Sequence, residues 1–153
     1  MDENSLYERD ERLWMLEQIK ALKDDRISEL DFPNLREHLQ CQVIHQQHEL
    51  RWAVKDICWK LMELEFADIS PKEILELQSE ILTLRNAAER HFEFTPSILD
   101  DYLVPRLPKI WASALRLANY QGPFAPPVKP YTLEQITDFD WYPDFYSRPP
   151  HKP

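Results

Sequence analysis

The sequence predicts an all-α fold, an irregular bundle of four to five main helices around one long central helix. The chain has 153 residues but a single glycine, Gly122, and the tight turns of β-hairpins depend on glycine. Apolar residues recur every three or four positions, as in an amphipathic helix, and no segment alternates as a half-buried strand does. Serine, threonine or aspartate precedes several periodic segments, which is a helix-start signal.

The first periodic segment predicts a helix that begins at Ser5, as its cap, and ends at about Lys23. Its apolar positions recur every three residues and form one stripe, which consists of Leu13, Leu16, Ile19 and Leu22. A short connector over residues 24–30 is expected to lead into the next helix.

The central helix is predicted over residues 33–66, because no glycine and no further proline follows Pro33 there and Asp31 can cap its start. At 100° per residue its apolar residues form two stripes on roughly opposite sides. The first stripe consists of Leu35, Leu39, Val43, Leu50, Val54, Ile57, Leu61 and Leu64. The second consists of Cys41, His45, His48, Trp52, Lys55, Trp59, Met62 and Phe66. We expect such a helix to be covered on both sides, at the centre of the bundle.

Two further helices are predicted before the only glycine. Ser70-Pro71 begins the first, whose apolar seam is Ile74, Leu77, Ile81, Leu84 and Ala88. Thr95-Pro96 begins the second, which Pro105 and Pro108 should kink or split. Gly122 is placed to be the residue just after its end.

The composition changes after Gly122, because eight of the 13 prolines lie beyond it. We therefore divide the chain into a helical bundle over residues 1–122 and a proline- and aromatic-rich strap over residues 123–153 that packs on the same domain. Thr132 and Gln135 form a capping box, so one short helix is expected within the strap.

Five large aromatic residues follow that short helix: Phe139, Trp141, Tyr142, Phe145 and Tyr146. Leaving them in water is costly, at about 25 cal/mol per Å² of apolar surface. Two interpretations remain open. Either the aromatic residues pack across the helices of their own chain, or they dock into a partner or a neighbouring subunit.

The order of several short motifs resembles the DUF29 family, a bacterial domain of unknown function. The matching motifs are Leu6-Tyr7 with Asp10 and Trp14, Leu30-Asp31 with Asn34-Leu35, Thr95-Pro96-Ser97-Ile98, and Pro130-Tyr131-Thr132-Leu133-Glu134-Gln135. They span nearly the whole chain. The resemblance implies an all-helical fold and no assigned activity.

Two stretches differ from the family pattern. Family members carry a Glu-Glu pair and then Leu-Gly where this chain has Arg36-Glu37-His38-Leu39, and a His-Leu-Leu-Lys run where it has Cys58-Trp59-Lys60-Leu61. If those family residues carry an activity, we expect this chain to have lost or altered it.

A candidate metal site lies on the central helix, where His38, Cys41, His45 and His48 fall within about 80° of one face. Pairs of such residues three or four apart can chelate a transition metal, although another helix must then supply a ligand. The alternative interpretation is that these residues continue the second stripe and serve helix packing or a subunit interface. A metal-binding protein or metal-dependent enzyme is therefore our second functional hypothesis.

Charge and composition narrow the classes of function. The net charge of −9 disfavours nucleic acid and anionic membranes as partners, although Arg85, Arg90, Arg106 and Arg116 could form a local patch. One glycine is too few for a phosphate-binding loop or a nucleophile elbow, and we assign no catalytic residue. Two cysteines and the lack of a long apolar stretch fit a cytoplasmic protein.

Our first functional hypothesis is a non-enzymatic interaction or regulatory protein that binds a protein partner or a second copy of itself, with no cofactor. Aromatic residues are favoured anchors of such interfaces. The candidate interface residues are His45, His48, Trp52, Trp59, Phe66, Trp141 and Tyr142.

Overall fold

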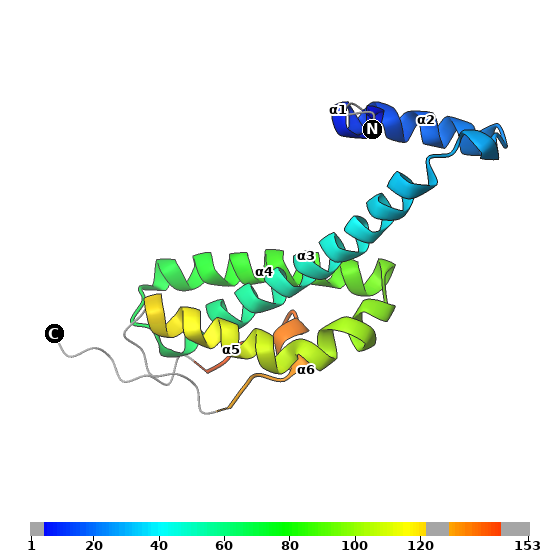
Figure 1. The fold of residues 1–153 in the computed structure, drawn as a ribbon. Helices are drawn as coiled ribbons and strands as arrows, with labels where there is room; N and C mark the ends of the chain where they lie inside the picture. The colour runs from blue at the N-terminus through cyan, green and yellow to red at the C-terminus, as the bar shows by residue number, and fades with distance from the viewer. Residues whose placement is uncertain (1–4, 122–128, 145–153) are drawn as a thin grey trace. The chain divides into compact units, whose positions relative to one another are not determined.

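The computed structural model describes residues 5–121 and 129–144 of the chain, which form helices and no strand (Figure 1). The predicted all-α fold is confirmed. The helices are α1 (Leu6–Arg9), α2 (Glu11–Lys23), a short 3-10 helix (Ile27–Glu29), α3 (Phe32–Phe66), α4 (Pro71–Phe94), a π-helical segment (Leu99–Leu103), α5 (Val104–Gln121) and α6 (Leu133–Thr137). The predicted end of a helix at Gly122 and the proline-rich part of the predicted strap lie outside the described residues.

Helix α3 is the long helix predicted from the sequence, and it takes part in two structural units. Residues 1–45 form the first unit and residues 46–153 the second. The compositional division at residue 122 therefore does not coincide with the structural one, which falls inside α3.

The first unit departs from the single helix predicted between Ser5 and Lys23. Asp10 ends α1 with φ at −153°, and its carboxylate accepts a hydrogen bond of 2.9 Å from the Leu13 amide at the start of α2. A short acidic side chain competes with helix continuation in this way, because it can bond to the backbone amides of a new first turn. The prediction of one uninterrupted helix is wrong at this point.

Asp31 joins α2 to the start of α3 within the first unit. Its carboxylate accepts hydrogen bonds from the buried Trp14 indole at 3.1 Å and from the Asn34 side chain at 2.7 Å. Its own amide donates to the Gln18 side chain at 2.7 Å, and the Asn34 amide donates back at 3.3 Å, as expected of a helix cap. The cap predicted at Asp31 is confirmed, and it also fixes the connector between the two helices.

The second unit has one hydrophobic core, to which α3, α4, α5 and α6 all contribute. Its fully or nearly fully buried members include Leu50, Val54, Ile57, Leu61, Leu64, Ile81, Leu103, Ile110, Ala114, Ala118 and Ile136. Burying one large apolar side chain of this kind stabilises the fold by about 1.5 to 3 kcal/mol. The C-terminal half of α3 is thus the part that organises the bundle.

Pro105 and Pro108 both lie in α5, and neither ends the helix. A π-helical segment precedes α5, and Pro105 is the second residue of α5. A proline ring clashes with the carbonyl four residues earlier in a continuous α-helix, and a wider turn relieves that clash. Pro108 lies inside α5, which continues without a break to Gln121.

The described C-terminal residues pack on the core of the second unit. The predicted capping box of Thr132 and Gln135 is present at the start of α6. The ring of Tyr131 lies edge-on between Trp111 and Trp141, with centroids 5.2 and 5.5 Å away, and its hydroxyl donates to the Glu65 carboxylate. Burial, and then the bond to this carboxylate, raise the pKa of Tyr131.

Arg85 of α4 is buried beneath this C-terminal segment. Its guanidinium donates to the carbonyls of Ile136 at 2.9 Å, Gln135 at 3.0 Å and Trp141 at 2.9 Å, and it lies 5.0 Å from the centre of the Tyr142 ring. With 1% of its surface exposed, it cannot join the arginine surface patch considered from the sequence.

A basic pocket on the second unit

The seven candidate interface residues fall into two groups. His45, His48 and Trp52 lie on the surface of α3, whereas the other four are partly buried and pack against the core of the second unit. The latter four are Trp59, Phe66, Trp141 and Tyr142. The second stripe of α3 is therefore covered only from about Trp59 onward, and the expectation that both stripes are covered along the whole helix is wrong.

The four candidate metal ligands are not gathered into a metal site. Among residues 5–121 and 129–144, no three histidine, cysteine, aspartate or glutamate side chains come together in a way that would hold an ion. In the first unit, His38 instead lies with its Nδ1 atom 3.0 Å from a Glu11 carboxylate oxygen and with its ring 5.7 Å from that of Trp14.

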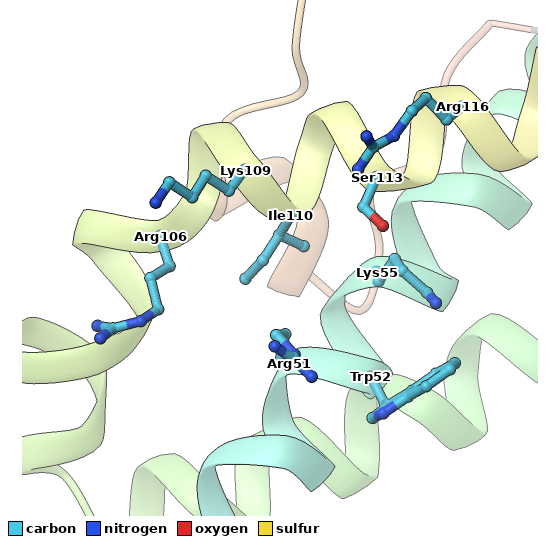
Figure 2. A pocket seen from close by; sticks show the side chains of 8 residues that line it. All are labelled: Arg51, Trp52, Lys55, Arg106, Lys109, Ile110, Ser113 and Arg116. Atoms are coloured by element: carbon cyan, nitrogen blue, oxygen red, sulfur yellow. The ribbon is translucent and has the colours of Figure 1, made fainter.

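A pocket of about 510 Å³ lies between α3 and α5 in the second unit (Figure 2). Its lining residues come from one face of each helix: Arg51, Trp52 and Lys55 from α3, and Arg106, Lys109, Ile110, Ser113 and Arg116 from α5. In Figure 2, Ile110 and Ser113 point from α5 toward α3. Ile110 belongs to the buried core, so the pocket has an apolar floor and a charged rim.

The charge of the pocket is opposite to that of the chain. Five of the chain's 18 lysines and arginines line it, together with no aspartate or glutamate, although the chain carries a net charge of −9. None of the ion pairs between described residues includes one of these five cations. A cleft lined by one sign of charge concentrates field lines and attracts ions of the opposite sign.

Aromatic rings hold two of the pocket's cations without neutralising them. The Lys55 ammonium lies 3.6 Å from the centre of the Trp52 ring, and the Arg106 guanidinium lies 4.3 Å from that of Tyr102. Arg106 also donates to the Tyr102 carbonyl at 3.1 Å. Contacts of a cation with an aromatic face are worth about 0.5 to 2 kcal/mol and leave the positive charge available to a ligand.

The lining favours binding of an anion over acid–base chemistry. Its polar groups are five cations, the indole of Trp52 and the hydroxyl of Ser113. General base catalysis most often uses a histidine or a carboxylate within hydrogen-bond reach of the substrate, and the pocket's lining contains neither.

The model of a family described as Domain of unknown function DUF29 matches residues 6–142 of the sequence. The chain belongs to the DUF29 family. No curated protein and no solved structure matches the sequence. The description of DUF29 assigns no function, so the side chains of this DUF29 chain are the basis for a functional proposal.

Sequence reasoning found only part of the pocket of this DUF29 chain. The sequence placed Arg106 and Arg116 in a possible arginine patch, and Trp52 and Lys55 in the second stripe of the central helix, but Arg51 and Lys109 were missed. Their signal was spacing, because residues three, four or seven apart share one face of a helix. The proximity of α3 and α5 in space could not be read from that spacing.

The two cysteines of this DUF29 chain lie in different environments. Cys41 is exposed, whereas Cys58 lies in the core, and burial raises the pKa of its thiol to about 12. The thiolate is the reactive form, so Cys58 should be inert near neutral pH. We expect a disulfide reagent such as DTNB to modify one thiol per folded chain and both after denaturation. Cys41→Ser should remove the fast reaction, and a fast reaction that persists in this variant would contradict the buried position of Cys58.

No helix within the described ranges, 5–121 and 129–144, is both long enough and apolar enough to cross a membrane.

Proposed function

We propose that this DUF29 chain is a protein-interaction protein that associates with a second copy of itself through the apolar surface of its first unit. The observation that carries the proposal is a change in exposure along one stripe of α3. Leu50, Val54, Ile57, Leu61 and Leu64 are each 0% exposed, whereas Leu39 is 63% and Val43 53% exposed. The pattern that builds the core thus continues along the helix without being covered.

Helix α2 carries a second uncovered apolar face in the same unit. Its stripe of Leu13, Leu16, Ile19 and Leu22 is between 43% and 51% exposed, and the residues that α2 does bury are Trp14, Gln18 and Ala21. A unit of this length rarely builds a sufficient hydrophobic core by itself, and oligomerisation is one of the usual remedies.

The exposed area is close to what a dimer requires. Nine large apolar residues of the first unit are about half exposed: Leu13, Leu16, Ile19, Leu22, Ile27, Phe32, Leu39, Val43 and Ile44. Full burial of one such side chain is worth about 1.5 to 3 kcal/mol, which at about 25 cal/mol per Å² corresponds to roughly 60 to 120 Å² of surface. Nine half-exposed side chains therefore offer on the order of 400 Å² of apolar surface for burial. A standard interface buries about 800 Å² per partner, of which roughly 500 Å² is apolar.

The polar residues beside the α3 stripe favour a second copy as the partner. Two copies of a chain with net charge −9 repel each other, unless the contacting surfaces are nearly neutral. Arg36, Gln40 and Gln42 flank the stripe. The acidic Glu37 lies about 160° around the helix from Leu39, on the side opposite the stripe. Glutamine amides both donate and accept hydrogen bonds, so the same flank can pair with its own copy.

Analytical ultracentrifugation of the full chain tests the proposal over a range of protein concentrations. We expect the chain to sediment as a dimer or larger assembly, and the double variant Leu39→Glu with Val43→Glu to sediment as a monomer with unchanged helicity. Leu75→Glu with Leu82→Glu is the matched control, because it adds the same charge at exposed positions of α4, outside the first unit. A monomeric chain at all concentrations, or an unchanged mass in the double variant, would refute self-association.

A further inference from the structure

We propose that the basic pocket binds a small ligand that carries two or more adjacent phosphate groups, with the size of a nucleoside di- or triphosphate. This proposal concerns the second unit alone and does not depend on self-association through the first. Four properties of the pocket support it: its volume, its charge, the arrangement of its cations, and the exposed indole at its edge.

The volume fits a ligand of nucleotide size. Pockets for small molecules and cofactors occupy about 300 to 1,000 Å³, and this pocket measures about 510 Å³. The buried side chain of Ile110 forms an apolar floor, while the charged side chains of Arg51, Lys109 and Arg116 are exposed at the surface. An ion can therefore reach the charged groups without disturbing the core.

The number of cations calls for a ligand with several negative charges. A single carboxylate would leave most of the pocket's positive charge unbalanced. A terminal phosphate carries about 1.5 to 2 negative charges near neutral pH, so two or three adjacent phosphates match five cations far better. Arginine also offers a planar fork of N–H donors that fits phosphate oxygens in pairs.

The cations line opposite walls of the pocket. Arg106, Lys109 and Arg116 recur at helical spacing on α5, and Ser113 adds a hydroxyl donor to the same face. Arg51 and Lys55 are four residues apart on α3 and come from the other side (Figure 2). A row of phosphates between the helices would receive donors from both walls.

Trp52 provides a surface for the remainder of the ligand. Its side chain is 54% exposed although it lines the pocket. Stacking of a nucleobase on an aromatic ring is worth about 1 to 3 kcal/mol and tolerates any base. In the pocket a nucleotide would place its phosphates among the cations and stack its base on Trp52.

The charge of the rest of the chain favours a small ligand over a nucleic acid. Outside the pocket, 13 lysines and arginines stand against all 27 aspartates and glutamates. An extended polyanion gains affinity from phosphate contacts along its length, and this chain would repel it beyond the pocket. A ligand that fits within the pocket avoids that repulsion.

Isothermal titration calorimetry of the full chain at low ionic strength tests the proposal with ATP, AMP, pyrophosphate and inorganic phosphate as probes. We expect ATP and pyrophosphate to bind, inorganic phosphate to bind at least about tenfold more weakly, and added salt to weaken every interaction. No binding of any of these probes at millimolar concentration would overturn the proposal.

Two charge variants show whether binding occurs in the pocket. Lys109→Ala with Arg116→Ala should weaken ATP and pyrophosphate at least about tenfold. Lys72→Ala with Arg90→Ala is the matched control, because it removes the same charge from exposed positions on α4. Equal weakening in both variants would show non-specific attraction and overturn the assignment to the pocket. Duplex DNA that binds more tightly than ATP, and is weakened by the pocket variant alone, would replace the small ligand with a nucleic acid.

Trp52→Ala separates the two regions of the pocket. It should weaken ATP more than pyrophosphate, because only ATP carries a base to stack, whereas loss of the contact between the ring and Lys55 affects both probes. Loss of both probes to the same extent would contradict the stacking role of Trp52. Sedimentation of the pocket variants should match that of the unmodified chain, so failure of the pocket proposal is distinguishable from failure of self-association.

Discussion

Replacing Arg85 with methionine should lower the free energy of unfolding by about 3 kcal/mol or more. The guanidinium is buried and donates to three backbone carbonyls of the C-terminal segment, which methionine would leave without a donor. Each buried polar group that loses its partner costs about 1 to 3 kcal/mol. The relief of burying a charge offsets part of this loss, but methionine cannot replace any of the three hydrogen bonds.

Urea denaturation followed by circular dichroism measures this effect. Arg90→Met is the matched control, because Arg90 lies on the exposed side of the same helix and its replacement should change stability by less than about 0.5 kcal/mol. Equal stability of the two variants would mean that Arg85 does not anchor the C-terminal segment.

Leu61→Ala should destabilise the chain by about 2 to 5 kcal/mol, whereas Leu39→Ala in dilute solution should cost less than about 0.5 kcal/mol. The two leucines belong to the same stripe of α3, but Leu61 is 0% and Leu39 63% exposed. Truncating Leu61 removes buried methyl groups and leaves a cavity in the core, and truncating Leu39 removes surface that water already contacts.

The same pair of variants also bears on self-association. In thermal unfolding experiments, the midpoint temperature of the unmodified chain should rise with protein concentration, since assembly favours the folded state by mass action. Leu39→Ala should weaken that concentration dependence, and Leu61→Ala should not. A concentration dependence that is the same in both variants would place the interface away from the α3 stripe.

Helix positions were largely predictable, because they follow from local chemistry. The absence of glycine and internal proline after Pro33 predicted the long helix that the structure shows as Phe32–Phe66. The caps at Asp31, Ser70 and Thr132 were likewise readable, since the donor amide lies within three residues of each acceptor. Asp10 was not recognised as a break, because its neighbours continue a helical pattern.

Which face of a helix is covered could not be predicted from the same pattern. Leu39 and Leu61 fit one stripe equally well, yet exposure separates them, because burial depends on whether another element lies alongside. Arg85 is a polar residue whose burial could not be predicted, since arginine is seldom fully buried. Its hydrogen-bond partners are backbone carbonyls about 50 residues away in the sequence, and no side chain there indicates the contact.

The pocket was beyond prediction for a related reason. Arg51 and Arg116 become neighbours only once α3 and α5 pack together, and a net charge of −9 conceals a local cluster of opposite sign. The net charge bears on extended partners such as nucleic acids and anionic membranes, and it gives no information about a small ligand that contacts only this cluster.

The π-helical segment at Leu99–Leu103 makes this point of the chain tolerant of a change in length. A π-helical turn holds about one residue more than an α-helical turn, so after the deletion of one residue the segment can close as an α-helix without turning α5. The same deletion in the first turn of α5 would turn the rest of that helix by about 100° around its own axis. Ile110, Ala114 and Ala118 would then leave the core, and Lys109 and Arg116 would move away from α3. Natural variants of this chain should therefore show one-residue gaps within the π-helical segment more often than within the start of α5.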